Sequence, residues 1–249
     1  MANQNFNTFG RGGVIADQAT FDAGLRAHMI KVYNYMASGL ALSGIVAVAV
    51  FNVPSLAQMF FEITPRGVAG LNMLGWIAVF APFGLLLLMG FRAAQMSVGG
   101  IQAIYWAVTG LMGISLSLLL FRYTGASVAR AFFVTAASFG ALSLYGYTTK
   151  RDLSAFGKFL FMGLIGLILA SLVNMFFPSG TMTFIVSVAG VLIFSGLIAY
   201  DTQKIKEQYA DSWGSDVAEK VAIFGALSLY LDFVNLFQFL MAFMGQSRD

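Results

Sequence analysis

Seven long apolar runs constrain the fold of this chain more than any other feature of its sequence. They cover residues 32–53, 68–91, 98–121, 126–147, 155–177, 182–203 and 221–244. A helix needs about 20 consecutive apolar residues to cross the hydrocarbon core of a bilayer. Of all 249 residues, 59% are hydrophobic and only 10% are charged, whereas about 25% are charged in soluble domains. The sequence therefore predicts an all-α polytopic membrane protein with seven transmembrane helices.

The runs also divide the chain into regions. Residues 1–31 are polar and rich in Gly and Asn, and they lack the apolar core of a signal peptide. We expect them to form a mobile N-terminal tail, with a short amphipathic approach to the membrane over residues 20–31. Residues 32–244 form the membrane domain and 245–249 a short C-terminal tail. The polar stretches are too short to bury a core of their own, so no soluble domain is expected.

The distribution of basic residues predicts the orientation in the membrane. With seven spans, ten of the 14 Lys and Arg residues fall on the side of the N-terminus and four on the other side. Because Lys and Arg are enriched in cytoplasmic loops, we expect a cytoplasmic N-terminus and an external C-terminus. The same distribution explains the net charge of +3 as a topology signal, so we expect the lipid bilayer and not nucleic acid as partner.

Several kinds of chemistry are excluded or disfavoured by composition. The chain has no Cys and one His, His28, so thiol catalysis and Cys-ligated metals are excluded and no zinc cluster is visible. No nucleophile with a matching base is visible either. We expect no enzymatic activity, no resident metal and no cofactor.

A carboxylate near the middle of the last apolar run is the first candidate functional residue. Asp232 lies in the run 221–244, and Asn235 follows one turn later on the same face as a supporting polar residue. An Asp at the centre of a membrane helix costs roughly 2.5–3.5 kcal/mol on insertion scales, and such residues face protein or water and have a partner. Two interpretations remain: Asp232 lines an ion or proton path, or it only joins helices through buried hydrogen bonds.

Two further charged residues lie on the N-terminal side of the spans. Asp201 is near the end of the run 182–203, and Arg92 directly follows the run 68–91. Alternatively, Asp201 forms a surface pair with Lys204 at i+3, and Arg92 is an anchor that reaches the lipid phosphates. The two aspartates can meet only if the helix of the sixth span continues beyond Gln203.

If the two aspartates meet, their chemistry follows from elementary electrostatics. Two carboxylates in a low-dielectric interior cannot both ionise easily, and they titrate as a unit. A nearby Arg would oppose this and hold one of them charged. The pair would respond to protons, and it would also offer oxygen ligands to a hard cation such as calcium.

Two local patterns bear on helix packing. Ala136 and Gly140 form a small-residue pair at i, i+4, which favours close contact between membrane helices. The heptapeptide Phe-Gly-Ala-Leu-Ser-Leu-Tyr occurs twice, at residues 139–145 and 224–230. The repeat reflects either two helices with similar packing faces or an inverted repeat of three spans.

Four motifs together resemble one protein family. They are Phe91-Arg92 after a long apolar span, residues 146–154 (GYTTKRDLS), residues 200–203 (YDTQ) and residues 226–237 (ALSLYLDFVNLF). In this combination the sequence resembles the Bax inhibitor-1 (transmembrane Bax-inhibitor-motif) family, in its bacterial branch, over nearly all of the chain after the tail. Residues 226–237 are the most specific of the four. The single Arg92, followed by two alanines, departs from the basic cluster found in some relatives.

The resemblance implies a fold and two alternative functions. The fold is a bundle in the bacterial inner (plasma) membrane in which the seventh helix is central and the other six surround it. The first function is a pH-sensitive calcium leak, with Asp201 and Asp232 as the sensor pair in the ion pathway and Arg92 as a latch for the closed state. The alternative is regulation, because bacterial relatives include inhibitors of a membrane-bound ATP-dependent protease complex.

Overall fold

The protein is an all-α membrane protein with seven helices that are long and apolar enough to cross a bilayer, as the sequence predicts. The computed structural model describes residues 7–64 and 67–248, which form eight α-helices and one two-stranded sheet. The elements are α1 (Asn7–Asn52), α2 (Pro54–Phe60), β1 (Phe61–Thr64), β2 (Gly67–Leu71), α3 (Met73–Arg92), α4 (Val98–Arg122), α5 (Gly125–Thr148), α6 (Ser154–Phe176), α7 (Gly180–Gln208) and α8 (Ser215–Met244). All of the helices except α2 are long and apolar enough to span the membrane.

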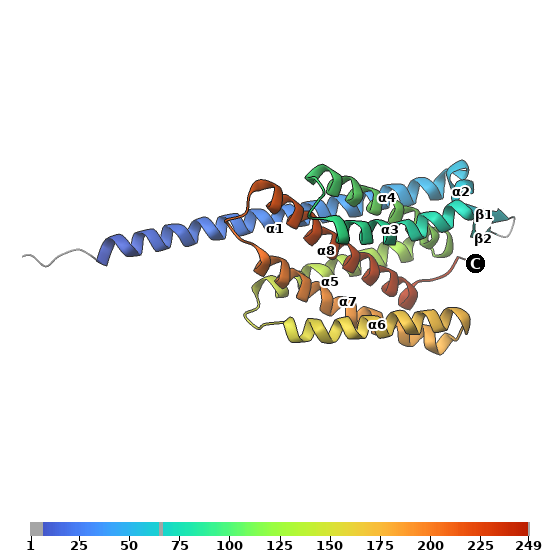
Figure 1. Ribbon diagram of the computed structural model, residues 1–249. Helices are drawn as coiled ribbons and strands as arrows, with labels where there is room; N and C mark the ends of the chain where they lie inside the picture. The colour runs from blue at the N-terminus through green and yellow to red at the C-terminus, as the bar shows by residue number, and fades with distance from the viewer. Residues whose placement is uncertain (1–6, 65–66, 249) are drawn as a thin grey trace, which may run out of the picture.

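The spans lie side by side in one bundle (Figure 1). The first part of α1 projects beyond the bundle at one end, and the chain ends near the opposite end, beside the β1–β2 hairpin (Figure 1). The loops α3–α4, α5–α6 and α7–α8 therefore lie at the end from which α1 projects, here called the N-terminal end.

Helix α8 occupies the centre of the bundle. Of its most apolar stretch 61% is buried, against 11–33% for the other six spans. It packs directly on α1, α4, α5 and α7, whereas α3 packs mainly on α4 and α6 mainly on α7. The bundle thus has a central α8, four direct neighbours, and an outer position for each of α3 and α6.

Buried hydrogen bonds attach α8 to α1 and α4. Ser43 of α1 donates to the carbonyl oxygen of Thr109 in α4 at 2.7 Å, and the Tyr230 hydroxyl lies 2.7 Å from Ser43 Oγ. Since Ser43 has a single proton, Tyr230 is the donor to it. Nearer the N-terminal end, Glu219 of α8 accepts hydrogen bonds from Lys31 and Tyr35, each at 2.6 Å. These contacts satisfy polar groups that hydrocarbon cannot satisfy.

The first spanning helix begins earlier than the sequence predicts. The expected amphipathic approach over residues 20–31 is part of this helix, because α1 is continuous from Asn7 to Asn52. The reason is a buried stripe at helical spacing, Leu25, Met29 and Val32, which lies on the core. Residues 1–6 of the expected tail lie outside the described residues.

The connection between the first two spans has structure of its own. The expected loop after Pro54 forms α2, and β1 pairs antiparallel with β2 in a hairpin that places Phe61 opposite Leu71. The second span, expected from residue 68, starts at Met73 because residues 67–71 belong to the hairpin. The Asn72 side chain then caps the helix by accepting a hydrogen bond from the Gly75 N–H at 3.0 Å.

The closest approach of α5 to a neighbour occurs at Gly146, where a Cβ atom would collide with the carbonyl oxygen of Ala199 in α7. Gly140, which the sequence pattern favoured for such a contact, instead faces open space. The two copies of the repeated heptapeptide also differ in environment. Tyr145 in the first copy is 47% exposed, whereas Tyr230 in the second is fully buried. The two identical heptapeptides therefore do not make equivalent contacts.

Replacing Gly146 with Ala should destabilise the protein, because the new methyl group meets backbone that cannot rotate away. Overpacking of this kind costs about 1–3 kcal/mol, and we expect a lower midpoint of thermal unfolding in detergent. Gly140→Ala is the matched control on the same helix, and it should be neutral or slightly stabilising, since Ala favours helix over Gly. Equal midpoints for the two variants would contradict the close packing of α5 on α7.

Candidate functional site

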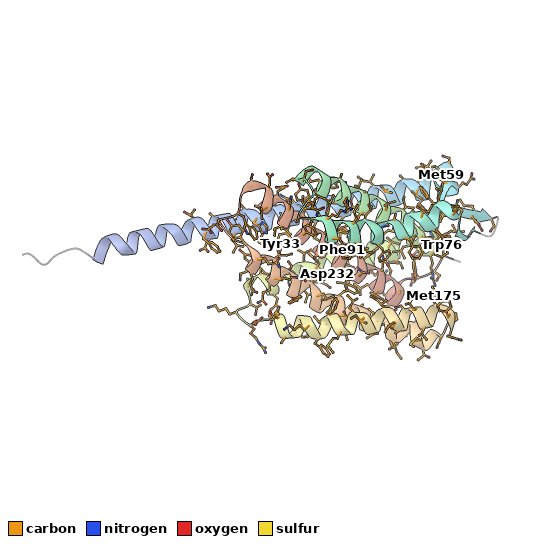
Figure 2. All side chains as sticks on the ribbon, in the orientation of Figure 1. Tyr33, Met59, Trp76, Phe91, Met175 and Asp232 are labelled. Carbon is orange, nitrogen blue, oxygen red and sulfur yellow. The ribbon has the colours of Figure 1, made fainter. Side chains whose placement is uncertain are left out.

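The structure brings Asp201 of α7 and Asp232 of α8 together. Their carboxyl groups lie within hydrogen-bonding reach of each other. Asp232 is 5% exposed, and it lies in the middle of the bundle (Figure 2). The meeting is possible because α7 continues to Gln208. Asp201 is therefore seven residues, or about 10 Å, inside its helix.

One oxygen of the pair has no donor. Oδ2 of Asp232 is buried and accepts no hydrogen bond from the described part of the chain. Two ionised carboxylates cannot bond to each other, so a hydrogen bond between Asp201 and Asp232 requires a proton on one of them. The pair is thus built to exchange a proton as a unit. Its state depends on the proton supply around it.

The pair lies in the wall of a large groove of about 1030 Å³ between α6, α7 and α8, and Phe83 of α3 also lines this groove. Helix α8 presents a half-buried stripe to this groove at every third or fourth position, formed by Ser228, Leu231 and Asn235. Lys158 and Lys204 line it nearer the N-terminal end, and Ser171 and Met175 of α6 line it farther along. The groove therefore extends along the bundle from a basic end past the two aspartates.

A second pocket of about 270 Å³ continues this groove. The two hollows share Ser171, Asn235 and Phe239 as lining residues, so they adjoin. Six of its nine lining residues are polar, namely Ser171, Asn174, Thr183, Ser187, Asn235 and Gln238. The two hollows together are here called the aspartate channel. It leads from the basic end of the groove, past the pair, toward the opposite end of the bundle.

Asn235 stands where the two hollows meet. Its side-chain amide donates to the carbonyl oxygen of Leu231 on its own helix at 2.8 Å. Asn235 thus lines both hollows, and one of its two amide protons is used in the bond to its own helix.

Lys204 is the cation next to the pair along α7. It lines the groove, it follows Asp201 by one helical turn, and its Nζ lies 5.9 Å from the centre of the Tyr200 ring. It does not form a close ion pair with Asp201, because the one ion pair within 4.0 Å in the described residues joins Lys31 and Glu219. Asp201 therefore faces the groove and is not a simple surface partner of Lys204.

The structure does not bring Arg92 to the pair. Arg92 is the last residue of α3, its side chain is exposed, and it does not line the groove. The reason is the packing of its helix, since α3 lies on α4 and not on α7 or α8. In this conformation the latch role of Arg92 has no contact to support it and remains a prediction.

Some lining residues were not singled out from the sequence. Lys158, Ser171 and Gln238 are polar residues in or beside apolar runs, and that is the signal by which they could have been found. No group of three or more His, Cys, Asp and Glu side chains that could hold a metal ion occurs in the part of the chain that the structure describes. The aspartate pair accordingly has too few ligands for a closed metal site.

The fold and site define a class: a polytopic helical membrane protein whose central helix carries a buried carboxylate in the wall of a groove of about 1030 Å³. Comparison with known proteins gives the family. Residues 25–249 match the family described as "Inhibitor of apoptosis-promoting Bax1". The chain therefore belongs to the Bax inhibitor-1 family, as the sequence motifs predict.

Relatives in several bacteria resemble the chain over nearly its whole length. An "Uncharacterized protein" of Caulobacter vibrioides is 48% identical over 249 residues, which cover 98% of this chain and all of that protein. "Uncharacterized protein RP147" of Rickettsia prowazekii is 46% identical over 92% of this chain and 94% of its own length. "Inner membrane protein YbhL" of Escherichia coli K12 is 42% identical over 91% of this chain and 94% of its own length.

Because the chain has no Cys, single cysteines can report which residues of α8 line a water-filled channel. We expect Ser228→Cys and Asn235→Cys to react with a small, charged, water-soluble methanethiosulfonate reagent in membranes. Ala226→Cys and Leu229→Cys should stay unreactive, because both positions are fully buried on the other faces of α8. If all four variants were equally unreactive in membranes but reactive after unfolding, the groove would be filled with lipid and would not conduct ions.

Proposed function

We propose that the protein is a pH-sensitive calcium leak channel of the bacterial inner membrane, with Asp201 and Asp232 as proton sensor in the ion pathway. The observation that carries the proposal is the contact of the two carboxyl groups in the wall of the aspartate channel. Intramembrane ionisable residues that face a cavity usually mark ion paths or proton relays. The membership of the family supports the same conclusion.

The ligands available in the channel suit passage better than storage. Calcium takes six to eight oxygen ligands, and the pair with Asn235 offers fewer than that from the protein. Water must complete the shell, and the groove of about 1030 Å³ has room for it. A site that binds an ion weakly while it stays partly hydrated lets the ion leave again, as conduction requires.

The proposed switch uses protons on the aspartate pair. At high pH both carboxyls tend to ionise, and a cation from another helix, the latch role predicted for Arg92, holds the closed arrangement against their repulsion. Protonation removes that attraction and lets the walls of the channel separate. By linkage, protons favour the open state only if that state binds them more tightly than the closed state does.

Simple arithmetic limits how sharp the switch can be. Changing a two-state equilibrium from 1:99 to 99:1 takes about 5.5 kcal/mol. A difference of one pKa unit between the closed and the open state supplies about 1.36 kcal/mol per site. Even two coupled sites would each need a difference of about two units. We therefore propose a graded leak that rises as the pH falls from about 8 to about 6.

Regulation of a membrane-bound protease is the second candidate function. The observation in its favour is the projection of α1 beyond the bundle, on the side predicted to be cytoplasmic (Figure 1). A helix end that stands clear of the membrane domain offers a surface to a partner. Such a regulator needs no ion flux of its own, so calcium uptake into liposomes by purified protein separates the two functions.

The central test is calcium flux into liposomes by Asp232 variants, measured between pH 8 and pH 6. Asp232→Asn imitates the protonated side chain without a titrating group, so its flux should be high and nearly independent of pH. Asp232→Leu should also lose the pH response, with an altered basal flux. Asn174→Ala, in the polar pocket away from the pair, should keep the pH response. Unchanged pH profiles in both Asp232 variants would make Asp232 a purely structural residue.

Two basic residues on the same side of the membrane can be compared to locate the latch. Lys204→Gln removes the charge that favours ionised Asp201, so protons bind at higher pH and the rise in flux should move upward by less than about 0.7 pH unit. That limit corresponds to the 1 kcal/mol or less of a partly exposed pair. Arg92→Gln should raise the flux at pH 8, because the predicted latch is then lost. An unchanged profile in Arg92→Gln would show that Arg92, which does not line the groove in this conformation, is not the latch.

A further inference from the structure

A second groove lies on the other side of α8 from the aspartate channel, between α1 and α5. Both helices pack on α8, but they make little contact with each other. The gap between them has a volume of about 600 Å³ near the N-terminal end of the bundle. Its lining residues are Arg26, Met29, Ile30 and Tyr33 of α1 and Phe139, Gly140, Ser143, Leu144 and Tyr147 of α5.

The groove changes character along its length. The two helices run in opposite directions, so Arg26 and Tyr147 lie at its mouth, whereas Tyr33 and Gly140 lie seven residues, or about 10 Å, deeper. Its walls are apolar, with Met29, Ile30 and Leu144 among them. It thus has a polar mouth at the end of the bundle and an apolar slot at the depth of lipid chains.

Unpaired positive charge gathers at the mouth. Arg26 is exposed and forms no ion pair within 4.0 Å in the described residues, although Asp22 precedes it by one turn. Nearby, Lys206 of α7 donates a hydrogen bond to the carbonyl oxygen of Tyr147 at 2.8 Å, and its Nζ lies 5.4 Å from the centre of that ring. An arginine and a lysine therefore lie at the open end of an apolar slot, and neither forms an ion pair within 4.0 Å in the described residues.

The deep end of the groove is held by hydrogen bonds. The Tyr33 hydroxyl and Ser143 Oγ are 2.6 Å apart, and Ser143 Oγ is 3.1 Å from Thr202 Oγ1 of α7. These bonds join α1, α5 and α7 beneath the slot. Its floor is fixed, and the groove does not simply close when the helices approach.

We propose that this groove binds one anionic phospholipid, with its phosphate at Arg26 and Lys206 and an acyl chain in the slot between α1 and α5. Basic pockets between membrane helices bind anionic headgroups, and the guanidinium of Arg is well suited to phosphate. Lipid is the solvent around the bundle, so an apolar slot open to it takes up a chain. With the predicted orientation, the lipid belongs to the cytoplasmic leaflet.

Native mass spectrometry of the purified full chain in detergent tests the proposal. The probes are phosphatidylglycerol and phosphatidylethanolamine with identical acyl chains, and glycerol 3-phosphate as a headgroup without chains. We expect phosphatidylglycerol to bind at least tenfold more tightly than either of the others. Equal binding of the two lipids would overturn headgroup recognition, and equal binding of glycerol 3-phosphate would show a simple phosphate site.

Two variants and two matched controls place the lipid in this groove. Arg26→Gln should weaken phosphatidylglycerol binding about tenfold, the size expected for a lost charge-assisted hydrogen bond. Gly140→Leu should block the slot, and it should fold because a side chain at Gly140 meets open space. Arg92→Gln and Gly84→Leu are the controls, since both positions lie outside the groove and Gly84 is equally open.

The same variants can overturn the proposal. If Arg26→Gln binds phosphatidylglycerol as the wild type does, the headgroup does not lie at Arg26 and the proposal fails. If Gly140→Leu unfolds, its thermal midpoint will show it, and the comparison of Arg26→Gln with Arg92→Gln then decides alone.

Discussion

Hydrocarbon offers no hydrogen-bond partners, and this constraint determines which helix of the bundle stands in the middle. An unsatisfied polar group costs several kcal/mol at membrane depth. Helix α8 carries Glu219, Tyr230 and Asp232, and it is the most buried span. Helix α6 is at the other extreme: only 11% of its most apolar stretch is buried, and it stands in the outer layer. The most buried span thus carries buried polar side chains, and the least buried span is among the most apolar.

The two sides of the central helix α8 differ in hydrogen bonding and in packing. Toward α1 and α4, the polar groups of α8 are paired, as in the bond from Tyr230 to Ser43 at 2.7 Å. Toward α6 and α7, Oδ2 of Asp232 lacks a donor, and a groove replaces close packing. Only two buried side-chain atoms in the described residues lack a partner, His28 Nε2 and Asp232 Oδ2, and such unsatisfied groups indicate function more than stability. The same helix therefore stabilises the bundle on one side and carries the candidate site on the other.

The sequence predicts well how deep a residue lies in the membrane, but it predicts poorly which helices contact each other. Hydropathy gives the seven spans, and a carboxylate inside an apolar run gives Asp232, because both depend only on position along one helix. Arg92 and Asp201 lie on the same side of the bundle, yet they do not meet, because α3 packs on α4 while α7 packs on α8. Which helix borders which is decided by tertiary contacts that no single run of residues records.

Hydropathy alone also does not predict how far a helix extends beyond its apolar run, because that depends on tertiary contacts too. Residues 20–31 are too polar to count as a span, but Leu25 and Met29 are buried against the core and continue α1. Close contact is equally hard to locate, because both Gly140 and Gly146 are plausible from their neighbours. Only the position of Ala199 distinguishes them. The hairpin of β1 and β2 likewise depends on pairing between residues on either side of a turn.

The different bonding on the two sides of α8 also predicts which part of the bundle can move. Separating α1 from α8 would break buried hydrogen bonds. Helix α6 packs on α7 mainly through apolar contacts such as Gly157 beneath the Tyr200 ring, with one exposed side-chain bond from Asn174 to Thr183. Lipid chains are as apolar as those side chains, so exchanging helix contact for lipid contact costs little beyond lost packing. Helix α6 is also the outer wall of the aspartate channel. A shift of α6 would widen the groove while the network around Tyr230 stays intact, so the wall beside the aspartate pair is held by fewer buried polar contacts than the opposite side of α8.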